Sequence, residues 1–408
     1  MEENKKKNNK GLFAAGIFVG MAIIIAISGI AVNITGMISE LMPGEKDTAS
    51  VSDDPAVRRK IKSVEKLIDK YYVEEIDRAA EEEGIYKGII DSLDDKYSTY
   101  YTAEEMEKTL EDSAGEYGGI GCYIAYDTVA EHCYVAGIIP GYSADNAGLL
   151  EGDIFYKVDD EIVLDCTSEE VSNRVRGPEG TTVDLVMVRD GKEMEYTLVR
   201  ALVEIQSVSI NMADEKNKIG YMQIASFDLA TRDQFHYAMD ELEAEDVNAL
   251  IIDLRDNPGG DVDVATNMAE RLLPEGLIIY TEDKNGKRDE YKGDGKNEFK
   301  KPIVLLVNGN SASAAEIFAG ALKDYDKATL VGEKTYGKGV VQVVVPMTDG
   351  SAVKLTTAKY YLPKGECIHG KGIEPDVKVE LDVDAYRADG TDNQKEEALK
   401  ILREKLKK

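Results

Sequence analysis

The hydrophobic pattern begins with an apolar stretch, residues 11–39, that contains no charged side chain. A helix of about 20 apolar residues crosses the hydrocarbon core of a bilayer, so this stretch predicts one N-terminal transmembrane helix. Clustered lysines precede it and favour the cytoplasmic side, which predicts a single-pass cell-membrane protein of bacterial type with the rest of the chain outside the cytoplasm. These lysines are Lys5, Lys6, Lys7 and Lys10. A cleaved signal peptide, cut near Ala26-Ile27-Ser28, is the alternative.

After a polar stretch that predicts a tether at residues 40–56, apolar positions recur in steps of four and three. This spacing predicts an amphipathic helix, and its stripe consists of Val57, Ile61, Val64, Ile68 and Tyr71. Such a stripe must be covered, either by the domain that carries it or by a second copy of the chain, which would make a homodimer. The stripe Leu399, Leu402 and Leu406 near the carboxyl end offers the same two alternatives.

Short strand-forming runs broken by glycines follow and predict a β-rich domain over residues 114–202. The runs are residues 117–124, 132–136 and 183–189. The glycine-rich turn in the first run allows successive N–H groups to point the same way and to bind an anion such as a terminal carboxylate. An ordinary tight turn is the alternative.

From residue 203 to residue 381, apolar strands alternate with helical patterns, which predicts a sheet covered by helices with ligands at the carboxyl ends of its strands. The clearest elements are strands at residues 249–254 and 303–307 and helices at 262–273 and 314–325. We therefore predict an α+β multidomain protein. Its parts are a cytoplasmic tail and anchor (1–39), the tether (40–56), a helical region (57–113), the β-rich domain (114–202), an α/β domain (203–381) and a helical end (382–408).

Composition removes several classes of function. The chain has 78 acidic and 49 basic residues and a net charge of −29, which disfavours binding to a nucleic acid backbone. It has three histidines and four cysteines, without a C-x-x-C or H-E-x-x-H motif, so we predict no metal site. The pairing of the cysteines stays open.

Two segments carry residues suited to nucleophilic chemistry. Ser313 stands where a strand turns into a helix, beside unpaired N–H groups at the positive end of the helix dipole. With Glu316 three residues later, it also fits a capping box without catalysis. Lys338 is flanked by glycines at the start of an apolar strand, where desolvation lowers the pKa of a lysine and allows it to act as a base. A surface lysine is the alternative.

Other readings of these segments fit less well. Residues 332–339 approximate a phosphate-binding loop, but Gly339 replaces the Mg²⁺-binding Ser or Thr and a strand follows in place of a helix. A histidine base would be His132, His236 or His369, of which His369 is the best candidate. No G-x-S-x-G elbow accompanies them. A serine–lysine pair, in which an amine replaces imidazole, is the favoured arrangement.

The β-rich domain resembles a PDZ domain along its length, most clearly at residues 142–154 and 176–181. The resemblance implies that the carboxyl terminus of a protein or peptide adds as an extra strand beside four residues of the glycine-rich turn. These are Gly119, Ile120, Gly121 and Cys122. Arg174 or Arg176 would then connect the bound peptide to the active site.

Four later segments resemble the carboxyl-terminal processing (tail-specific) serine proteases, whose catalytic domain is crotonase-like: residues 253–260, 311–317, 335–342 and 372–376. The resemblance implies that Ser313 is the nucleophile, that Lys338 is the general base and that Gln342 orients the lysine. The oxyanion hole would consist of the amides of Gly259 and Ala314, with Gly260 as the adjacent alternative to Gly259. Ala315 departs from many relatives, which have a second serine there.

The same resemblance implies a protease without cofactor whose substrates are proteins or peptides with free carboxyl ends. The rival from another class is a membrane-tethered peptide binder that has kept the protease shape without catalysis. Binding of tail peptides without turnover would distinguish the two.

Overall fold

The computed structural model describes residues 50–407, so the predicted membrane anchor and residues 40–49 of the predicted tether lie outside the described residues. Within this range, no helix is both long and apolar enough to cross a bilayer. The described chain divides into two compact units. The first comprises the residues up to Glu107 together with Val341–Ala358, and the second comprises Lys108–Val340 and the chain from Lys359 onward.

The first unit is built from helices and a small antiparallel sheet. After the short 3₁₀ turn η1 (Val51–Asp53), its elements are α3 (Pro55–Tyr71), α4 (Arg78–Asp91), β1 (Thr99–Tyr101), most of β17 (Val340–Pro346) and most of β18 (Ala352–Tyr361). Strand β18 pairs with β1 and with β17. Asp54 caps α3 by accepting the Ala56 N–H, and Pro55 occupies the first helical position. Helix α3 has no buried residue.

Helix α5 (Ala103–Ala114) contains the boundary between the units, and the β-rich region of the second unit follows it. Strand β2 (Glu116–Gly119) pairs with β9 (Ala201–Glu204). The main sheet has the order β3-β4-β5-β7-β8, with the short strand β6 beside β5, which places β3 at an edge. Its elements are β3 (Cys122–Asp127), β4 (His132–Ile138), α6 (Ser143–Asn146), β5 (Ile154–Val158), β6 (Glu161–Ile162), α7 (Ser168–Val175), β7 (Thr182–Arg189) and β8 (Lys192–Val199).

A second sheet of six strands carries the chemistry-bearing loops. Its order is β10-β11-β12-β15-β16-β19, parallel from β11 onward and antiparallel at β10. The strands are β10 (Val208–Asp214), β11 (Ile219–Ile224), β12 (Ala249–Asp253), β15 (Ile303–Val307), β16 (Ala328–Gly332) and β19 (Val377–Lys378). Every residue of β12 and β15 is buried, as expected for apolar parallel strands with both faces covered.

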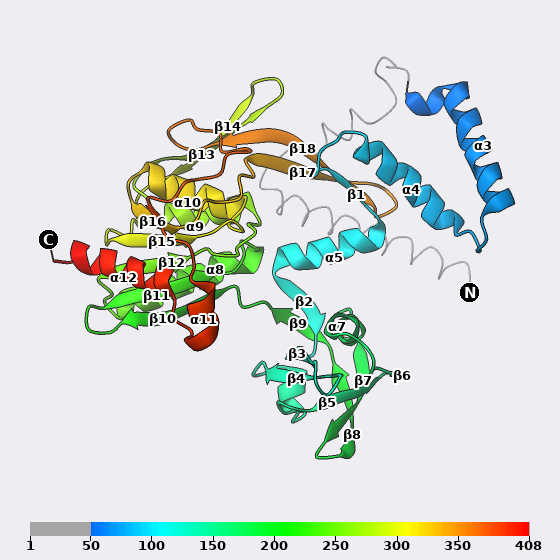
Figure 1. The fold of residues 1–408 in the computed structure, drawn as a ribbon, viewed down its shortest axis with the longest axis horizontal. Coiled ribbons are helices and arrows are strands. Elements are labelled where there is room, and N and C mark those ends of the chain that lie inside the picture. Colours follow the sequence, from blue (N-terminus) through cyan, green and yellow to red (C-terminus); the bar gives the residue numbers. More distant parts are fainter. Residues whose placement is uncertain (1–49, 408) are drawn as a thin grey trace, which may run out of the picture. The chain divides into compact units, whose positions relative to one another are not determined.

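Helices accompany this sheet (Figure 1): α8 (Leu229–Ala244), α9 (Val262–Glu270), α10 (Ala314–Asp324), α11 (Val383–Asp389) and α12 (Asn393–Lys405). A hairpin of β13 (Gly276–Asp283) and β14 (Arg288–Gly293) lies between β12 and β15 in sequence. Ala398 and Leu402 of α12 are buried against Ile251 and Leu306 of the sheet. Of the predicted C-terminal stripe, Leu402 is therefore covered by its own domain and Leu399 packs against the same cluster, whereas Leu406 is exposed.

Candidate active site

Ser313 ends the loop after β15 and immediately precedes α10, the position that the sequence predicts. Its backbone has φ 53° and ψ −116°. A residue with a side chain in such a sparsely populated region costs on the order of 1–3 kcal/mol and persists only where its surroundings hold it. The Ser313 N–H donates to Glu316 Oε2 at 3.0 Å, and its carbonyl oxygen accepts the Ile317 N–H at 3.0 Å. The strained turn is thus held at both peptide groups.

Glu316 connects this turn to the loop that carries Lys338. Its carboxylate is fully buried. Besides the Ser313 N–H, it accepts the Thr335 hydroxyl at 2.5 Å, the Gly337 N–H at 2.8 Å and the Lys338 N–H at 2.9 Å. The amides of Ser313 and Lys338 donate to the same oxygen, Oε2, so the two backbones lie side by side although 24 residues separate them in sequence.

A second bridge joins the same two residues at their carbonyl groups. The Tyr360 hydroxyl lies 2.8 Å from the Lys338 carbonyl oxygen and 3.2 Å from that of Ser313. The Tyr360 ring is almost fully buried, which fixes the hydroxyl. Neither bridge was anticipated from sequence. Only the Ser313–Glu316 spacing signalled that Glu316 matters, and nothing signalled Tyr360.

Three histidines were candidates for an alternative base. Only His369 is recorded beside the Lys338 loop: its Nδ1 accepts the Gly339 N–H at 3.3 Å. A Cβ at Gly339 would lie 2.5 Å from the His369 backbone nitrogen, so the close approach requires glycine. His132 lies on β4, and His236 lies on α8, where its Nε2 contacts Asn267 Oδ1 at 2.8 Å.

Gly259 lies against Ser313 at the carboxyl end of β12. Its φ is +102°, and a Cβ there would lie 2.7 Å from Ser313 Cβ and 2.8 Å from the Ala314 nitrogen. The Gly259 N–H, however, donates to Asn257 Oδ1 at 2.8 Å. Within residues 50–407, the N–H groups of Gly260 and Ala314 have no recorded acceptor. An oxyanion hole at Gly259 requires its peptide to rotate away from Asn257, whereas Gly260 needs no such release.

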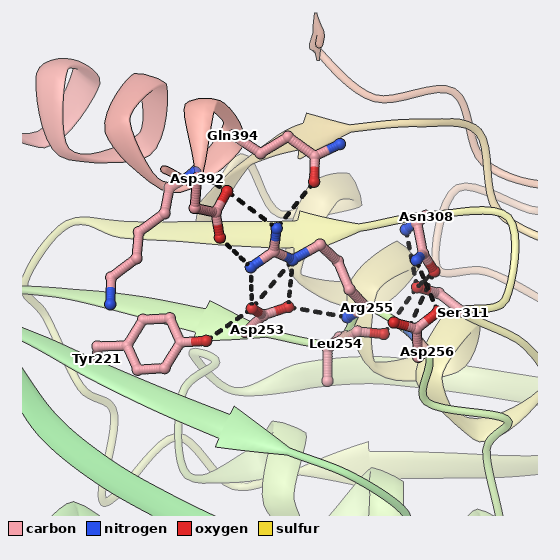
Figure 2. Close-up of polar contacts among 10 residues, drawn as sticks. Tyr221, Asp253, Leu254, Arg255, Asp256, Asn308, Ser311, Asp392 and Gln394 are labelled. Carbon is pink, nitrogen blue, oxygen red and sulfur yellow. Dashed lines mark hydrogen bonds and ion pairs between the residues drawn. The ribbon is translucent and has the colours of Figure 1, made fainter. Parts of the chain in front are cut away.

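Further contacts hold the two loops together (Figure 2). The Ser311 hydroxyl donates to the Leu254 carbonyl oxygen at 2.7 Å. The Ala312 N–H donates to the Asn257 carbonyl oxygen at 3.0 Å. Asn257 is fully buried and its Nδ2 donates to the Ile224 carbonyl oxygen at 2.8 Å. Sequence reasoning did not assign Asn257 a role.

Gln342 lies on β17 in the first unit, whereas Ser313 and Lys338 belong to the second. Its Nε2 donates to Thr356 Oγ1 on β18 at 3.3 Å. Its role in orienting the lysine stays a prediction. Among the described residues, no group of three or more His, Cys, Asp or Glu side chains is placed to hold a metal ion.

The predicted peptide-binding residues lie at the turn between β2 and β3. Gly119 ends β2, and Cys122 begins the edge strand β3. Ile120 is buried, and its carbonyl oxygen accepts the Ala144 N–H at 2.9 Å. Gly121 has φ +81°, and a Cβ there would lie 2.2 Å from Tyr142 Cβ. Burial raises the pKa of the Cys122 thiol to about 12, so this thiol stays neutral.

The two arginines near this turn differ in their partners. Arg174 Nε donates to Glu161 at 2.9 Å. The Arg176 guanidinium lies 4.1 Å from the centre of the Tyr117 ring on β2, and its Nε is buried without a hydrogen-bond partner. Arg176 is therefore the arginine that is held beside the β2–β3 turn.

Comparison with known proteins identifies relatives over most of the chain. The model of peptidase family S41 matches residues 218–379, and that of the activating protease CtpB N-terminal domain matches residues 13–105. The chain is 35% identical to carboxy-terminal processing protease CtpA of Bacillus subtilis over 366 residues, which are 89% of this chain and 77% of the relative. It is 32% identical to the carboxyl-terminal-processing protease of Synechocystis over 318 residues, 77% of this chain and 74% of the relative.

Solved structures give similar matches. The photosystem II D1 C-terminal processing protease is 30% identical with a TM-score of 0.47, and the match covers 80% of this chain and 91% of that protein. A putative S41 protease from Bacteroides fragilis is 18% identical with a TM-score of 0.50, and the match covers 81% and 92% of the two chains.

Proposed function

The chain belongs to the carboxy-terminal processing proteases of peptidase family S41, and we propose that it is a membrane-anchored, extracytoplasmic serine endopeptidase that selects protein substrates by their carboxyl-terminal tails. As a family member it is a serine-type peptidase. The anchor, the compartment, the tail selection and the catalytic residues are proposals, each argued from the residues below.

The observation that carries a serine–lysine mechanism is the double bridge between Ser313 and Lys338. Glu316 Oε2 accepts both amide N–H groups, and the Tyr360 hydroxyl contacts both carbonyl oxygens. The backbone of Lys338, the proposed base 25 positions away in sequence, therefore lies beside the strained turn of Ser313, the proposed nucleophile. An amine serves as the base of a serine nucleophile when it is neutral and positioned within reach of the hydroxyl.

In this mechanism the neutral Lys338 amine takes the proton of the Ser313 hydroxyl as Oγ attacks the peptide carbonyl carbon. The developing oxyanion accepts hydrogen bonds from the Ala314 N–H and from a glycine N–H of the 259–260 pair. Lys338 then protonates the leaving amine, and an acyl-enzyme remains. Water, deprotonated by the same lysine, hydrolyses the ester and frees Ser313.

Alanine substitutions test these roles. We expect Ser313→Ala and Lys338→Ala each to abolish cleavage of fluorescein-labelled β-casein while the melting temperature stays near that of the wild type. Lys334→Ala is the matched control, because Lys334 lies in the same loop but forms an exposed ion pair with Glu374 at 2.8 Å. Full activity of Lys338→Ala would show that Lys338 is not the base. If cleavage is lost in His369→Ala and not in Lys338→Ala, His369 is the base.

Tail selection is proposed for the edge strand β3, in the manner of a PDZ domain. The edge of β3 opposite β4 is not paired by any strand of its sheet in the described chain, so an extended peptide can add there and form main-chain hydrogen bonds. Its terminal carboxylate would lie at the turn of residues 119–122, with Arg176 close to this turn. Carboxylate recognition by such a turn depends on a free carboxyl end.

Two substrate peptides that differ only in a free or an amidated carboxyl end test this selection. We expect the wild type to cleave the free form faster and Arg176→Ala to lose that preference. Arg174→Ala is the control, since Arg174 pairs with Glu161. Equal rates on both peptides in the wild type would contradict tail selection. Tail binding without any cleavage would instead favour the rival function, a membrane-tethered peptide binder.

A further inference from the structure

Arg255, in the loop that follows β12, binds the start of the C-terminal helix α12. Only 14% of the Arg255 side chain is exposed. Its Nε and Nη2 bond Asp253 at 3.0 and 2.5 Å, and Nη1 and Nη2 bond Asp392 at 3.1 and 2.7 Å (Figure 2). Nη1 also donates to Gln394 Oε1 at 2.9 Å. Asp392 and Gln394 lie at the amino end of α12.

From the other side the same loop is bound to the segment that leads to Ser313. The next residue, Asp256, accepts hydrogen bonds from Asn308 Nδ2 at 2.9 Å and Asn310 Nδ2 at 2.8 Å. Its N–H donates to Asn308 Oδ1 at 3.0 Å (Figure 2). Arg255 and Asp256 thus direct consecutive side chains to two different elements. The peptide between them is held against both.

The C-terminal partners are themselves fixed by contacts that do not involve the loop. Asp392 caps α12 by accepting the Lys395 N–H at 2.9 Å. Gln394 is fully buried, and its Nε2 donates to the Val379 carbonyl oxygen at 2.7 Å. Ala398 and Leu402 hold the helix against the sheet. A bidentate carboxylate–guanidinium pair has a specific geometry. The fixed position of Asp392 therefore also fixes the position of Arg255.

We propose that Asp392, assisted by Gln394, is a positioning residue for peptide cleavage. By binding Arg255, it sets the position of the loop in which Gly259 lies against Ser313 and Ala314. The inference rests on the proposed function of that site. Hydrogen-bond donors for an oxyanion must be placed to within a fraction of an ångström, and a misplacement of about 1 Å costs up to about 10²-fold in rate. Docking of the C-terminal helix is therefore required for the rate of the chemical step.

The test separates the clamp from the helix cap. Asp392→Ser keeps a good N-cap residue but removes the carboxylate from Arg255. We expect kcat of the full-length protein in detergent, measured on a quenched fluorescent peptide with a free carboxyl end, to fall about tenfold. KM should change less than twofold, because donors aimed at the oxyanion act in the transition state. Asp392→Asn retains one acceptor for Arg255 and should recover part of kcat.

Arg403→Ala is the matched control on the same helix. Arg403 Nε bonds Asp214 Oδ2 at 2.7 Å, so this variant removes another ion pair between α12 and the sheet without touching Arg255. We expect its kcat to equal that of the wild type. Hydrogen exchange of the peptide covering residues 254–261 should accelerate in Asp392→Ser and not in Arg403→Ala.

Two outcomes would overturn the inference. One is a kcat for Asp392→Ser equal to that of Arg403→Ala, and the other is an effect confined to KM. Failure of the proposed function is recognised separately: Ser313→Ala would then cleave the peptide as fast as the wild type.

Discussion

Ser313 and Gly259 both have backbone conformations that residues with side chains avoid, and they are packed against each other. The positive φ of Ser313 sharpens the turn from β15 into α10, and Gly259 leaves room for it. Because the space beside Ser313 is occupied by backbone atoms of residues 312 and 314, this room cannot be recovered by a side-chain rotation. The site therefore depends on Gly259 because this residue has no Cβ.

We expect Gly259→Ala to lose at least about 10²-fold in kcat/KM and to be less stable by about 1–3 kcal/mol. The new Cβ would lie 2.7 Å from the Ala312 carbonyl oxygen and from Ser313 Cβ, and φ at this position is +102°. Gly148→Ala is the control for φ alone, since Gly148 has φ +76° and a Cβ added there would meet no atom within 4 Å. Peptidase assays and urea denaturation measure both effects. Equal losses in the two variants would show that backbone strain, not contact with the nucleophile, is the cause.

Asp261, which directly follows the glycine pair, links stability to pH. Burial raises its pKa to about 7, and the neighbouring Asp263 adds to the rise. Its Oδ1 caps α9, while Oδ2 is buried without a hydrogen-bond partner. In the unfolded chain the pKa returns to about 4. The folded state therefore keeps a proton that the unfolded state releases, and this contribution to stability is complete below about pH 4 and is lost as the pH rises through about 7.

We expect Asp261→Asn, which keeps the helix cap, to be more stable than the wild type at pH 8 and to lack this part of the pH dependence. Urea denaturation at pH 5 and pH 8 measures the difference. Asp382→Asn, at the exposed cap of α11, is the control and should follow the wild type. A wild-type advantage over Asp261→Asn at pH 8 would contradict the expected sign.

For individual residues, local spacing predicted the contact between Ser313 and Glu316, whereas the other contacts of the candidate site join residues far apart in sequence. The three-residue step from Ser313 to Glu316 indicated a helix start, and the carboxylate does return to the Ser313 N–H. The same carboxylate also receives the Lys338 N–H. That contact depends on where the loop between β16 and β17 folds, which no local pattern encodes. The contacts of Asn257 and Tyr360 could not be predicted for the same reason.

Among the elements, α3 and α12 show how far periodicity alone can be taken. Both have an apolar stripe, and both were left with the same two alternatives. In the structure, Leu402 of α12 is fully buried, whereas Val64 of α3 is 48% exposed. Periodicity predicts that a face needs a cover but not which surface provides it. We propose that a second copy of the chain covers the stripe of α3, since α3 buries no residue itself.

We expect the wild type to be a dimer in light scattering after gel filtration and Val64→Asp to be a monomer, because a buried aspartate would cost several kcal/mol in the interface. Lys66→Asp introduces the same side chain at an exposed position outside the stripe and should remain dimeric. A wild type that is monomeric even at about 100 μM, where a dimer with a Kd of about 1 μM would be almost fully associated, would rule out the pairing.

The strands were predictable where both faces are covered. Strands β12 and β15 are continuous apolar runs, and the structure places them within one residue of the expected bounds. Strand β18 mixes lysines and threonines with apolar residues, so no alternation marks it, and its register with β1 joins residues more than 250 positions apart. Gln342 belongs to this part of the chain, and its partner Thr356 on β18 could not be foreseen.

For the whole molecule, this pairing means that the compact units are not continuous stretches of sequence. Segment 341–358 belongs with the residues before Glu107, although it lies inside the range expected for the α/β domain. Composition and hydropathy detect boundaries between domains that are continuous in sequence. They cannot detect a segment, such as 341–358, that belongs to a domain far away in sequence.

The compartment of the whole protein depends on residues 11–39, which lie outside the described residues. We expect the full-length protein in a bacterial host to sediment with membranes, to resist carbonate extraction and to be released by detergent, because one apolar helix of about 20 residues anchors a chain stably. A variant lacking residues 1–40 and expressed in the cytoplasm should be recovered in the supernatant. External protease should digest the full-length protein in spheroplasts, since the preceding lysines favour the cytoplasmic side.

An N-terminal epitope tag distinguishes the anchor from a cleaved signal peptide. With an uncleaved anchor, antibodies against the tag and against the carboxyl end detect one band of the same size in the membrane fraction. Cleavage near Ser28 would give an untagged, shorter protein that carbonate extracts. The second result would leave the peptidase and its loops unchanged, but it would remove the tether that we propose holds the protease at the outer face of the membrane.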